Sequence, residues 1–120
     1  VGNLSFYDET SRILFAGDVC SGLVPSGQPY AFVQDFEAYR GCMEGFHRRY
    51  MASNRVLRLW VEMVRDLKPE MIVPQHGMPF RGEAMQQMLA WLYDLKCGVD
   101  LVGPMNYQSH VTRPAVAAHF

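Results

Sequence analysis

Two short apolar segments most constrain what this chain can fold into. Residues 13–16 (ILFA) and residues 71–73 (MIV) are β-like runs, and each ends shortly before a side chain that can bind a metal, Asp18 or His76. Apolar runs of this length that end at turn-forming residues are typical of buried strands. The end of a strand holds a side chain rigidly, and the loop beyond it leaves that side chain open to a pocket. Asp18 and His76 are therefore the candidate functional residues.

The rest of the chain predicts a mixture of strands and helices. Residues 4–7 and 12–16 are expected to form a β-hairpin, because the tetrad between them (DETS) is rich in turn-forming residues. Helices are expected over residues 35–50, 54–67 and about 83–96, with Gly98 as the stop of the last one. Residues 74–82 are expected to be a loop. On the helix 54–67, the predicted inward residues are Val56, Leu57, Trp60, Val64 and Leu67.

This order of elements predicts an α/β fold in which helices pack on one face of a small sheet. A chain of 120 residues is one domain at most. Residues 1–103 carry the predicted elements, whereas residues 104–120 contain two prolines and no hydrophobic period, so they are expected to be a tail. The chain starts at Val1 without a methionine, next to strand-like sequence, which suggests a fragment or a processed product.

Composition excludes several classes of partner. The formal net charge is −1, so there is no broad basic surface to attract nucleic acid or an anionic membrane. No apolar run approaches the roughly 20 residues that a membrane-spanning helix needs, and no signal-peptide pattern is present. The three cysteines are odd in number and lack C-x-x-C spacing, which indicates reduced thiols in a cytoplasmic protein and excludes a zinc ribbon.

The two candidate residues suit a metal centre in kind. The two oxygens of an aspartate can bridge two metal ions, and a neutral imidazole suits iron, zinc or copper. Taken alone, however, a Gly-Asp pair at a strand end is also typical of a turn or a helix cap, and a lone histidine in a loop is also typical of a solvated side chain.

Several blocks together resemble the second half of the metallo-β-lactamase fold, an αββα sandwich. The resemblance is closest to the diiron branch that includes flavodiiron oxygen and nitric-oxide reductases and stand-alone oxygen-binding diiron proteins. The blocks are residues 14–18 (LFAGD), 49–54 (RYMASN), 69–77 (PEMIVPQHG) and a closing helix that carries Trp91. The resemblance covers roughly residues 3–102.

The resemblance implies roles for particular residues. Asp18 would bridge two non-haem iron ions, and His76 would be the last terminal ligand of one iron. Tyr50 matches a tyrosine that can lie near the iron pair and hydrogen-bond bound oxygen, although a structural role for Tyr50 is equally compatible with the sequence. His47, one helical turn from Tyr50, is expected to be an exposed helix residue rather than a neighbour of the metals.

The chain also departs from the family pattern. The motif H-x-E-x-D-H and a further histidine before the bridging aspartate are absent, since the only histidines are His47, His76, His110 and His119. His110 and His119 lie in the predicted tail and are not expected to substitute for the absent ligands. Most of the ligand set is therefore expected outside this chain, and two ligands alone hold two metal ions poorly. The flavodoxin-like part of flavodiiron reductases is absent as well, so no flavin site is expected.

Three functions remain open. The first is part of a non-haem diiron protein that binds or reduces dioxygen or nitric oxide, where the lack of a flavin part favours a sensor over a reductase. The second is a zinc-dependent hydrolase of the same fold, in which metal-bound water attacks an ester, thioester or lactam. The third is a metal-free half-domain that forms a homodimer or pairs with a chain carrying the first half, through a sheet edge left open.

Overall fold

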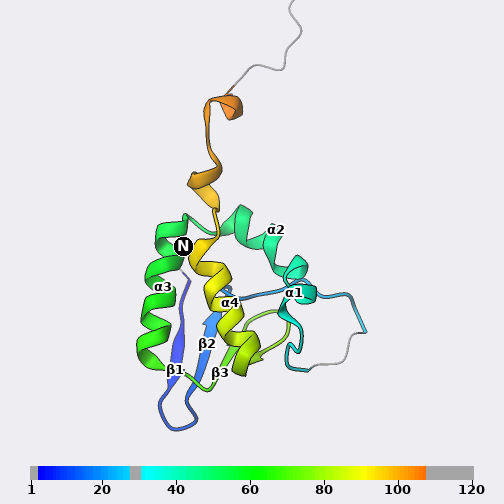
Figure 1. Cartoon of the computed structure of the whole chain (residues 1–120), viewed down its shortest axis with the longest axis vertical. Coiled ribbons are helices and arrows are strands. Elements are labelled where there is room, and N and C mark those ends of the chain that lie inside the picture. The colour runs from blue at the N-terminus through cyan, green and yellow to red at the C-terminus, as the bar shows by residue number, and fades with distance from the viewer. Residues whose placement is uncertain (1–2, 28–30, 108–120) are drawn as a thin grey trace, which may run out of the picture.

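The computed structural model describes residues 3–27 and 31–107, which form a single four-stranded sheet with helices packed against it (Figure 1). The strands are β1 (Phe6–Asp8), β2 (Ile13–Gly17), β3 (Met71–Pro74) and β4 (Phe80–Arg81), and their order in the sheet is the same as their order in the chain. The central pair β2 and β3 is parallel, whereas β1 with β2 and β3 with β4 are antiparallel.

The predicted hairpin is confirmed as β1 and β2. The side chain of Asp8 holds its turn by accepting hydrogen bonds from the Thr10 amide (3.1 Å) and the Ser11 hydroxyl (2.6 Å). The turn closes at Arg12, whose left-handed backbone (φ 59°) reverses the chain and whose amide bonds the Asp8 carbonyl (2.7 Å). An aspartate that bonds the backbone two residues on is the usual means of stabilising such a turn.

Residues 74–82, predicted to be a loop, contain the short strand β4, so that part of the prediction is wrong. Phe80 pairs with Ile72 on β3 and is fully buried. Two residues are too few to show an alternating pattern in the sequence, and β4 forms because burial of the Phe80 ring places the chain beside β3.

The helices are α1 (Phe36–Tyr39), α2 (Gly41–Tyr50), α3 (Asn54–Leu67) and α4 (Gly82–Asp94). The single helix predicted over residues 35–50 is divided at Arg40 into α1 and α2. The predicted helix 54–67 is confirmed as α3, and its start is capped by the Ser53 hydroxyl, which accepts from the Val56 amide. Lys68 ends α3 in a left-handed conformation (φ 52°), and Pro69 follows.

The predicted buried stripe of α3 is wrong at one position. Leu57, Val61 and Val64 are buried, but Val56 is 52% exposed. The buried stripe follows the spacing i, i+4, i+7, which places Val56 toward solvent. The predicted inward residues of α4 are all buried: Met85, Met88, Leu89, Leu92 and Leu95.

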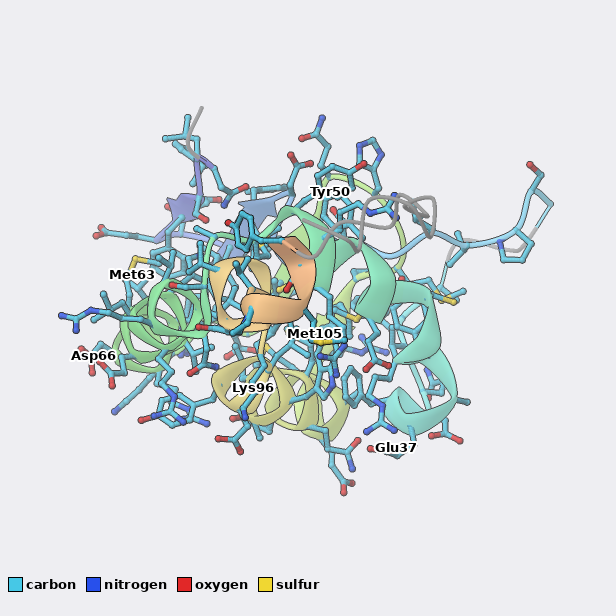
Figure 2. All side chains as sticks on the ribbon, turned by 90° about the horizontal axis from the view of Figure 1, so that it is seen from above. Glu37, Tyr50, Met63, Asp66, Lys96 and Met105 are labelled. Carbon is cyan, nitrogen blue, oxygen red and sulfur yellow. The ribbon has the colours of Figure 1, made fainter. Side chains whose placement is uncertain are left out.

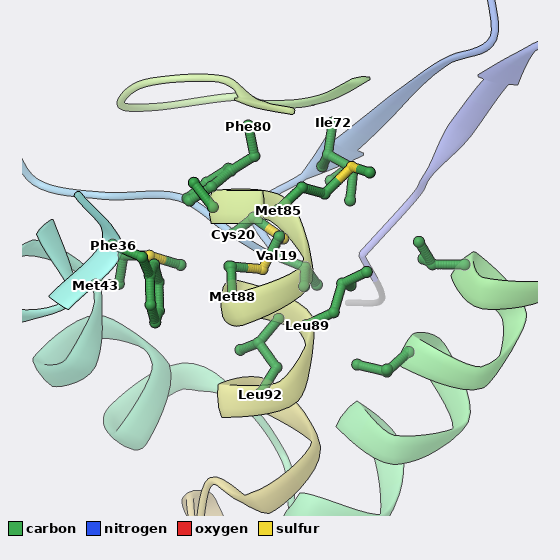
Figure 3. Close-up of a cluster of buried hydrophobic side chains, with 14 of the residues drawn as sticks. Val19, Cys20, Phe36, Met43, Ile72, Phe80, Met85, Met88, Leu89 and Leu92 are labelled. Carbon is green, nitrogen blue, oxygen red and sulfur yellow. The ribbon is translucent and has the colours of Figure 1, made fainter. Parts of the chain in front are cut away.

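Helix α4 is the centre of the hydrophobic core. Figure 3 shows Met85, Met88, Leu89 and Leu92 along one side of α4, surrounded by side chains from the sheet and from the first helices. Ile72 and Phe80 approach from β3 and β4, and Phe36 and Met43 approach from α1 and α2. Val19 and Cys20, from the turn directly after β2, enter the same core.

The helices lie on one side of the sheet, as predicted, and Figure 2 shows α3 and α4 on the same side of the strands. Alternate strand residues face this layer, and Leu14, Ala16 and Ile72 are buried there. The other side, here called the open face, is apolar and carries Phe6, Ile13, Phe15, Met71 and Val73. Phe6 is 64% exposed and Phe15 43% exposed, with ring centroids 6.3 Å apart.

The C-terminal part differs from the prediction. Helix α4 ends at Asp94, and Gly98 begins a short 3-10 helix, η1 (Gly98–Leu101), instead of stopping α4. Gly98 has a φ of 53° and lies against the backbone of Met51 and Ala52, where no side chain would fit. A second 3-10 turn, η2 (Pro104–Tyr107), leads away from the body of the molecule (Figure 1). Residues 108–120 of the predicted tail lie outside the described residues, as do His110 and His119.

Two further sequence predictions can be compared with the structure. All three cysteines, Cys20, Cys42 and Cys97, are free thiols, in agreement with the absence of a disulfide framework. Within residues 3–27 and 31–107, no helix has both the length and the apolar character needed to cross a membrane.

Candidate functional site

Asp18 and His76 lie at the same edge of the sheet. Because β2 and β3 are parallel neighbours, their carboxyl ends meet at one edge, and Asp18 directly follows β2 while His76 comes two residues after β3. The two ends are joined by a hydrogen bond from the Gln75 amide to the Gly17 carbonyl (2.8 Å), between the residues that precede His76 and Asp18. Both side chains are exposed. The structure thus brings together the two residues that the sequence singled out.

Each candidate residue stands next to a glycine that the backbone requires. Gly17 has a φ of 67°, and a Cβ there would lie 2.7 Å from the Leu4 carbonyl oxygen. Gly77 has a φ of 91°, and a Cβ there would lie 2.8 Å from the backbone nitrogen and oxygen of Gly22. Only glycine adopts such conformations without strain. These two glycine turns therefore fix the backbone positions of Asp18 and His76 at the ends of the strands.

The turn after Asp18 is tight and anchored in the core. The Ser21 amide donates to the Asp18 carbonyl (3.1 Å), and Cys20 takes a left-handed conformation (φ 71°) that is uncommon for a non-glycine residue. Val19 and Cys20 are buried beside α4 (Figure 3), and burial raises the pKa of the Cys20 thiol well above its usual value. A buried, hydrogen-bonded turn of this kind holds Asp18 more firmly than a surface loop would.

His47 supports this turn from within the core. The expectation that His47 is an exposed helix residue is therefore wrong. Its ring is fully buried: Nδ1 donates to the Met43 carbonyl (2.8 Å), and Nε2 accepts from the Cys20 amide (3.0 Å). This pair of bonds assigns the neutral tautomer with the proton on Nδ1. Burial lowers the pKa of His47, opposed in part by the bond to Met43.

Asn3 clamps Asp18 from the other side. Its side-chain oxygen accepts from the Asp18 amide (2.7 Å), and its side-chain nitrogen donates to the Ala16 carbonyl (2.8 Å). One side chain therefore satisfies two backbone groups at the end of β2.

Tyr50 lies at the C-terminal end of α2 and shares a cavity with Asp18. The cavity has a volume of about 570 Å³, and most of its wall is apolar, including Phe46, Val56 and Trp60. Tyr50 is 65% exposed, and its ring lies against Phe46 with centroids 5.1 Å apart. His76 does not line this cavity. The structure therefore places Tyr50 and Asp18 on the same cavity, with His76 outside its lining.

The donors of the described part of the chain do not make a complete metal site. Within residues 3–27 and 31–107, no group of three or more His, Cys, Asp or Glu side chains is placed to hold a metal ion. Asp18 and His76 are donors that suit iron by type, but zinc and non-haem iron sites in proteins take three or more protein ligands. Any metal held at this edge needs ligands from elsewhere.

Sequence patterns did not point to the supporting residues Asn3, Ser21 and Tyr39, whose roles depend on contacts between segments far apart in the chain. A signal for His47 was present. The spacing of Phe36, Tyr39, Met43 and His47 puts all four on one helical face, and the structure buries all four.

Comparison with known families decides the relationship. The model of the family described as "ODP family beta lactamase" matches residues 1–77, which is more than half of the 120 residues. The chain belongs to this ODP family. The resemblance to the metallo-β-lactamase fold is thereby confirmed, and with it the fold class.

Solved structures of ODP proteins are similar to this chain. A structure described as a peroxy diiron species of the chemotaxis sensor ODP is 48% identical, with a TM-score of 0.75 over 81% of this chain and 40% of that chain. The apo state of the chemotaxis sensor ODP from T. denticola has the same identity and coverage and a TM-score of 0.77. This chain thus spans about 40% of the length of the ODP structures that it matches.

A flavodiiron protein from Giardia intestinalis shares the fold. It is 17% identical, with a TM-score of 0.62 over 73% of this chain and 22% of that chain. A comparison with curated proteins found no match.

Proposed function

We propose that this chain supplies the Asp18–His76 edge of a non-haem diiron centre that binds dioxygen in a sensor of the ODP family. The observation that supports the proposal is the junction of the two parallel strand ends, where the Gln75 amide bonds the Gly17 carbonyl and Asp18 and His76 are the residues that follow. The 48% identical chemotaxis sensor, whose structure contains a peroxy diiron species, supplies the chemical class of the centre.

When bound, two ferrous ions would supply the electrons that bind dioxygen. The residues of this chain would bind and orient that pair. Asp18 would offer its two carboxylate oxygens to the two ions, and His76 would offer a neutral imidazole nitrogen to one of them. Tyr50, on the rim of the cavity that Asp18 also lines, would donate its hydroxyl proton in a hydrogen bond to a ligand held there. The apolar wall of that cavity would limit access of water.

The remaining ligands must approach from a part that the described residues do not contain. The open face offers the surface for such an approach, because its apolar side chains are left uncovered while the other face of the same sheet is buried. A second sheet packs on a first with apolar faces together. We therefore propose that a further half-domain covers Phe6 and Phe15 and brings the other ligands to the edge where Asp18 and His76 lie.

Metal analysis of the natural protein that contains this chain tests the proposal. Purified without oxygen and loaded with Fe(II), the wild-type protein is expected to hold two irons, and Asp18→Ala and His76→Ala are expected to hold fewer. Asp66→Asn, which removes an exposed charge in the last turn of α3, is the matched control and is expected to keep both irons. Zinc as the preferred metal, with hydrolysis of an ester or thioester, would instead support the hydrolase and contradict the proposal.

Binding of gases separates the sensor from a reductase. The reduced protein is expected to bind dioxygen without consuming it catalytically when an electron donor is supplied. Steady turnover of nitric oxide or dioxygen under the same conditions would identify a reductase and contradict the sensor assignment.

A further inference from the structure

One buried hydroxyl joins the segment that carries Asp18 to His76. Ser21 is 2% exposed, and its Oγ accepts from the His76 amide (3.3 Å) and donates to the Gly17 carbonyl (3.4 Å). Gly17 is the residue before Asp18, so Ser21 bonds the backbone next to Asp18 and the backbone of His76 itself. The next residue, Gly22, joins the same two segments through a backbone hydrogen bond from its amide to the His76 carbonyl (3.0 Å).

Tyr39 supports the same junction from α1. Its ring packs edge-on against Phe80 with centroids 5.8 Å apart, and its hydroxyl accepts from the Met78 amide (2.9 Å), two residues after His76. The hydroxyl also lies against Gly22 and Gly77, where a Cβ on Gly77 would be 2.5 Å from it. Burial raises the pKa of Tyr39, so the phenol remains protonated and neutral.

These contacts hold together two segments that belong to different parts of the chain. The turn of residues 18–22 follows β2, and residues 75–78 follow β3, so no covalent connection fixes the distance between Asp18 and His76. Metal ligands must be held within about 0.5 Å of their working geometry by the residues around them. Because the Asp18 and His76 side chains are exposed, core packing does not fix their positions.

We infer that Ser21 and Tyr39 are positioning residues that set the separation of Asp18 and His76. The inference rests on the proposed function, because a fixed separation matters only if both residues bind one metal centre. Ser21 restrains the separation directly, through the amide of His76 and the carbonyl next to Asp18. Tyr39 restrains it through Met78 and through its contact with Gly22 and Gly77.

Two conservative deletions in the natural protein test the inference. Ser21→Ala removes the bridging hydroxyl, and Tyr39→Phe removes the phenol oxygen while the ring remains. Ser11→Ala and Tyr7→Phe are the control variants. The Ser11 hydroxyl donates to the Asp8 carboxylate (2.6 Å) and the Tyr7 hydroxyl donates to the Leu67 carbonyl (3.4 Å), so each control loses a side-chain hydrogen bond away from the junction.

The first readout is amide hydrogen exchange in the metal-free protein, followed residue by residue by NMR. Ser21→Ala and Tyr39→Phe are expected to speed exchange at His76 and Gly22 at least tenfold more than the controls do, since local opening governs exchange at such sites. The second readout is Fe(II) affinity, measured by competition with a chelator. Each variant is expected to lose about tenfold in affinity relative to its control, the lower end of the loss typical of residues that orient metal ligands.

The outcomes separate this inference from the proposed function. If the wild-type protein holds two irons and both variants match their controls in exchange and in affinity, the inference is wrong while the proposed function stands. If the wild-type protein holds no iron, the proposed function itself is contradicted. Should Ser21→Ala fail to fold, Tyr39→Phe decides alone, because it keeps the buried ring.

Discussion

The amide of Cys20 donates a 3.0 Å hydrogen bond to Nε2 of His47, and the residue that donates it has a left-handed backbone (φ 71°). A left-handed conformation costs a non-glycine residue roughly 1–2 kcal/mol. The surrounding structure must therefore compensate for it, and His47 is the buried group that satisfies this amide. The turn that positions Asp18 depends in this way on a histidine from α2, 27 residues away in the sequence.

Replacement of His47 is expected to destabilise the fold. His47→Ala leaves the Cys20 amide without its buried partner and opens a cavity in the core, for a combined loss of about 2–4 kcal/mol in the free energy of unfolding. Urea denaturation followed by circular dichroism measures the loss. Arg49→Ala, an exposed residue on the same helix, is the control and is expected to change stability by less than about 0.5 kcal/mol. Equal stability of both variants would show that His47 does not support the turn.

His47 also predicts how stability depends on pH. Burial lowers the pKa of His47 below 6.5 in the folded state, so the unfolded chain takes up a proton that the folded protein does not. The contribution of His47 to stability is therefore fully present above about pH 7 and falls as the pH drops through 6.5 toward the folded pKa. Below that pKa, both states bind the proton and this group causes no further loss.

The comparison of wild-type protein with His47→Gln isolates this effect. Glutamine keeps a polar side chain but does not titrate, so the fall in stability between pH 7 and pH 5 is expected to be smaller in the variant. Hydrogen bonds from Ser11 and from the Cys97 amide lower the pKa values of the Asp8 and Asp100 carboxyl groups. These carboxylates therefore take up protons, and lose their contribution to stability, only at more acidic pH. An identical pH profile for both proteins would refute the assignment of the neutral buried imidazole.

The three thiols are expected to differ in reactivity. Cys20 and Cys97 are buried and burial raises their pKa values, whereas Cys42 is half-buried on α2. Because the thiolate is the reactive form, iodoacetamide at pH 8 is expected to label Cys42 first. Mass spectrometry of peptides gives the order, and Cys42→Ser supplies a protein in which the fast reaction is absent. Labelling of Cys20 before Cys42 in the folded protein would contradict the buried turn.

Two glycine substitutions are expected to act in opposite directions. Gly77→Ala puts a Cβ 2.5 Å from the Tyr39 hydroxyl at a φ of 91°, so the loop of His76 must move and stability falls by at least 1 kcal/mol. Gly45→Ala, in the exposed middle of α2 with open space around it, is expected to stabilise by about 0.5–1 kcal/mol. Thermal unfolding of the two variants beside wild type checks both signs. A neutral Gly77→Ala would mean that the loop is free to adjust.

Much of the fold could be predicted because its signals are local. The hairpin has a turn-rich tetrad between two apolar runs, and α3 has both an apolar stripe and a serine cap, so their bounds follow from nearby residues. Strand β4 and the position of Gly98 could not be predicted, because each depends on packing against residues far away in the chain. Phe80 pairs with Ile72, and Gly98 lies on Met51 and Ala52.

The candidate site divides in the same way. Asp18 and His76 could be singled out because each stands where an apolar run ends. The roles of the residues that hold them could not be predicted, because the helical spacing of Tyr39 and His47 indicates burial but not their hydrogen-bond partners, and Ser21 is an ordinary loop residue until the chain folds. Their roles arise from hydrogen bonds between segments 27 to 55 residues apart.

The most direct test of the central claim is diffraction at the iron absorption edge from crystals of the natural protein loaded with Fe(II). Two anomalous peaks are expected beside the strand ends, with the carboxylate of Asp18 in contact with both and the imidazole of His76 in contact with one. Iron peaks located elsewhere, with Asp18 and His76 both outside coordination distance, would contradict the account.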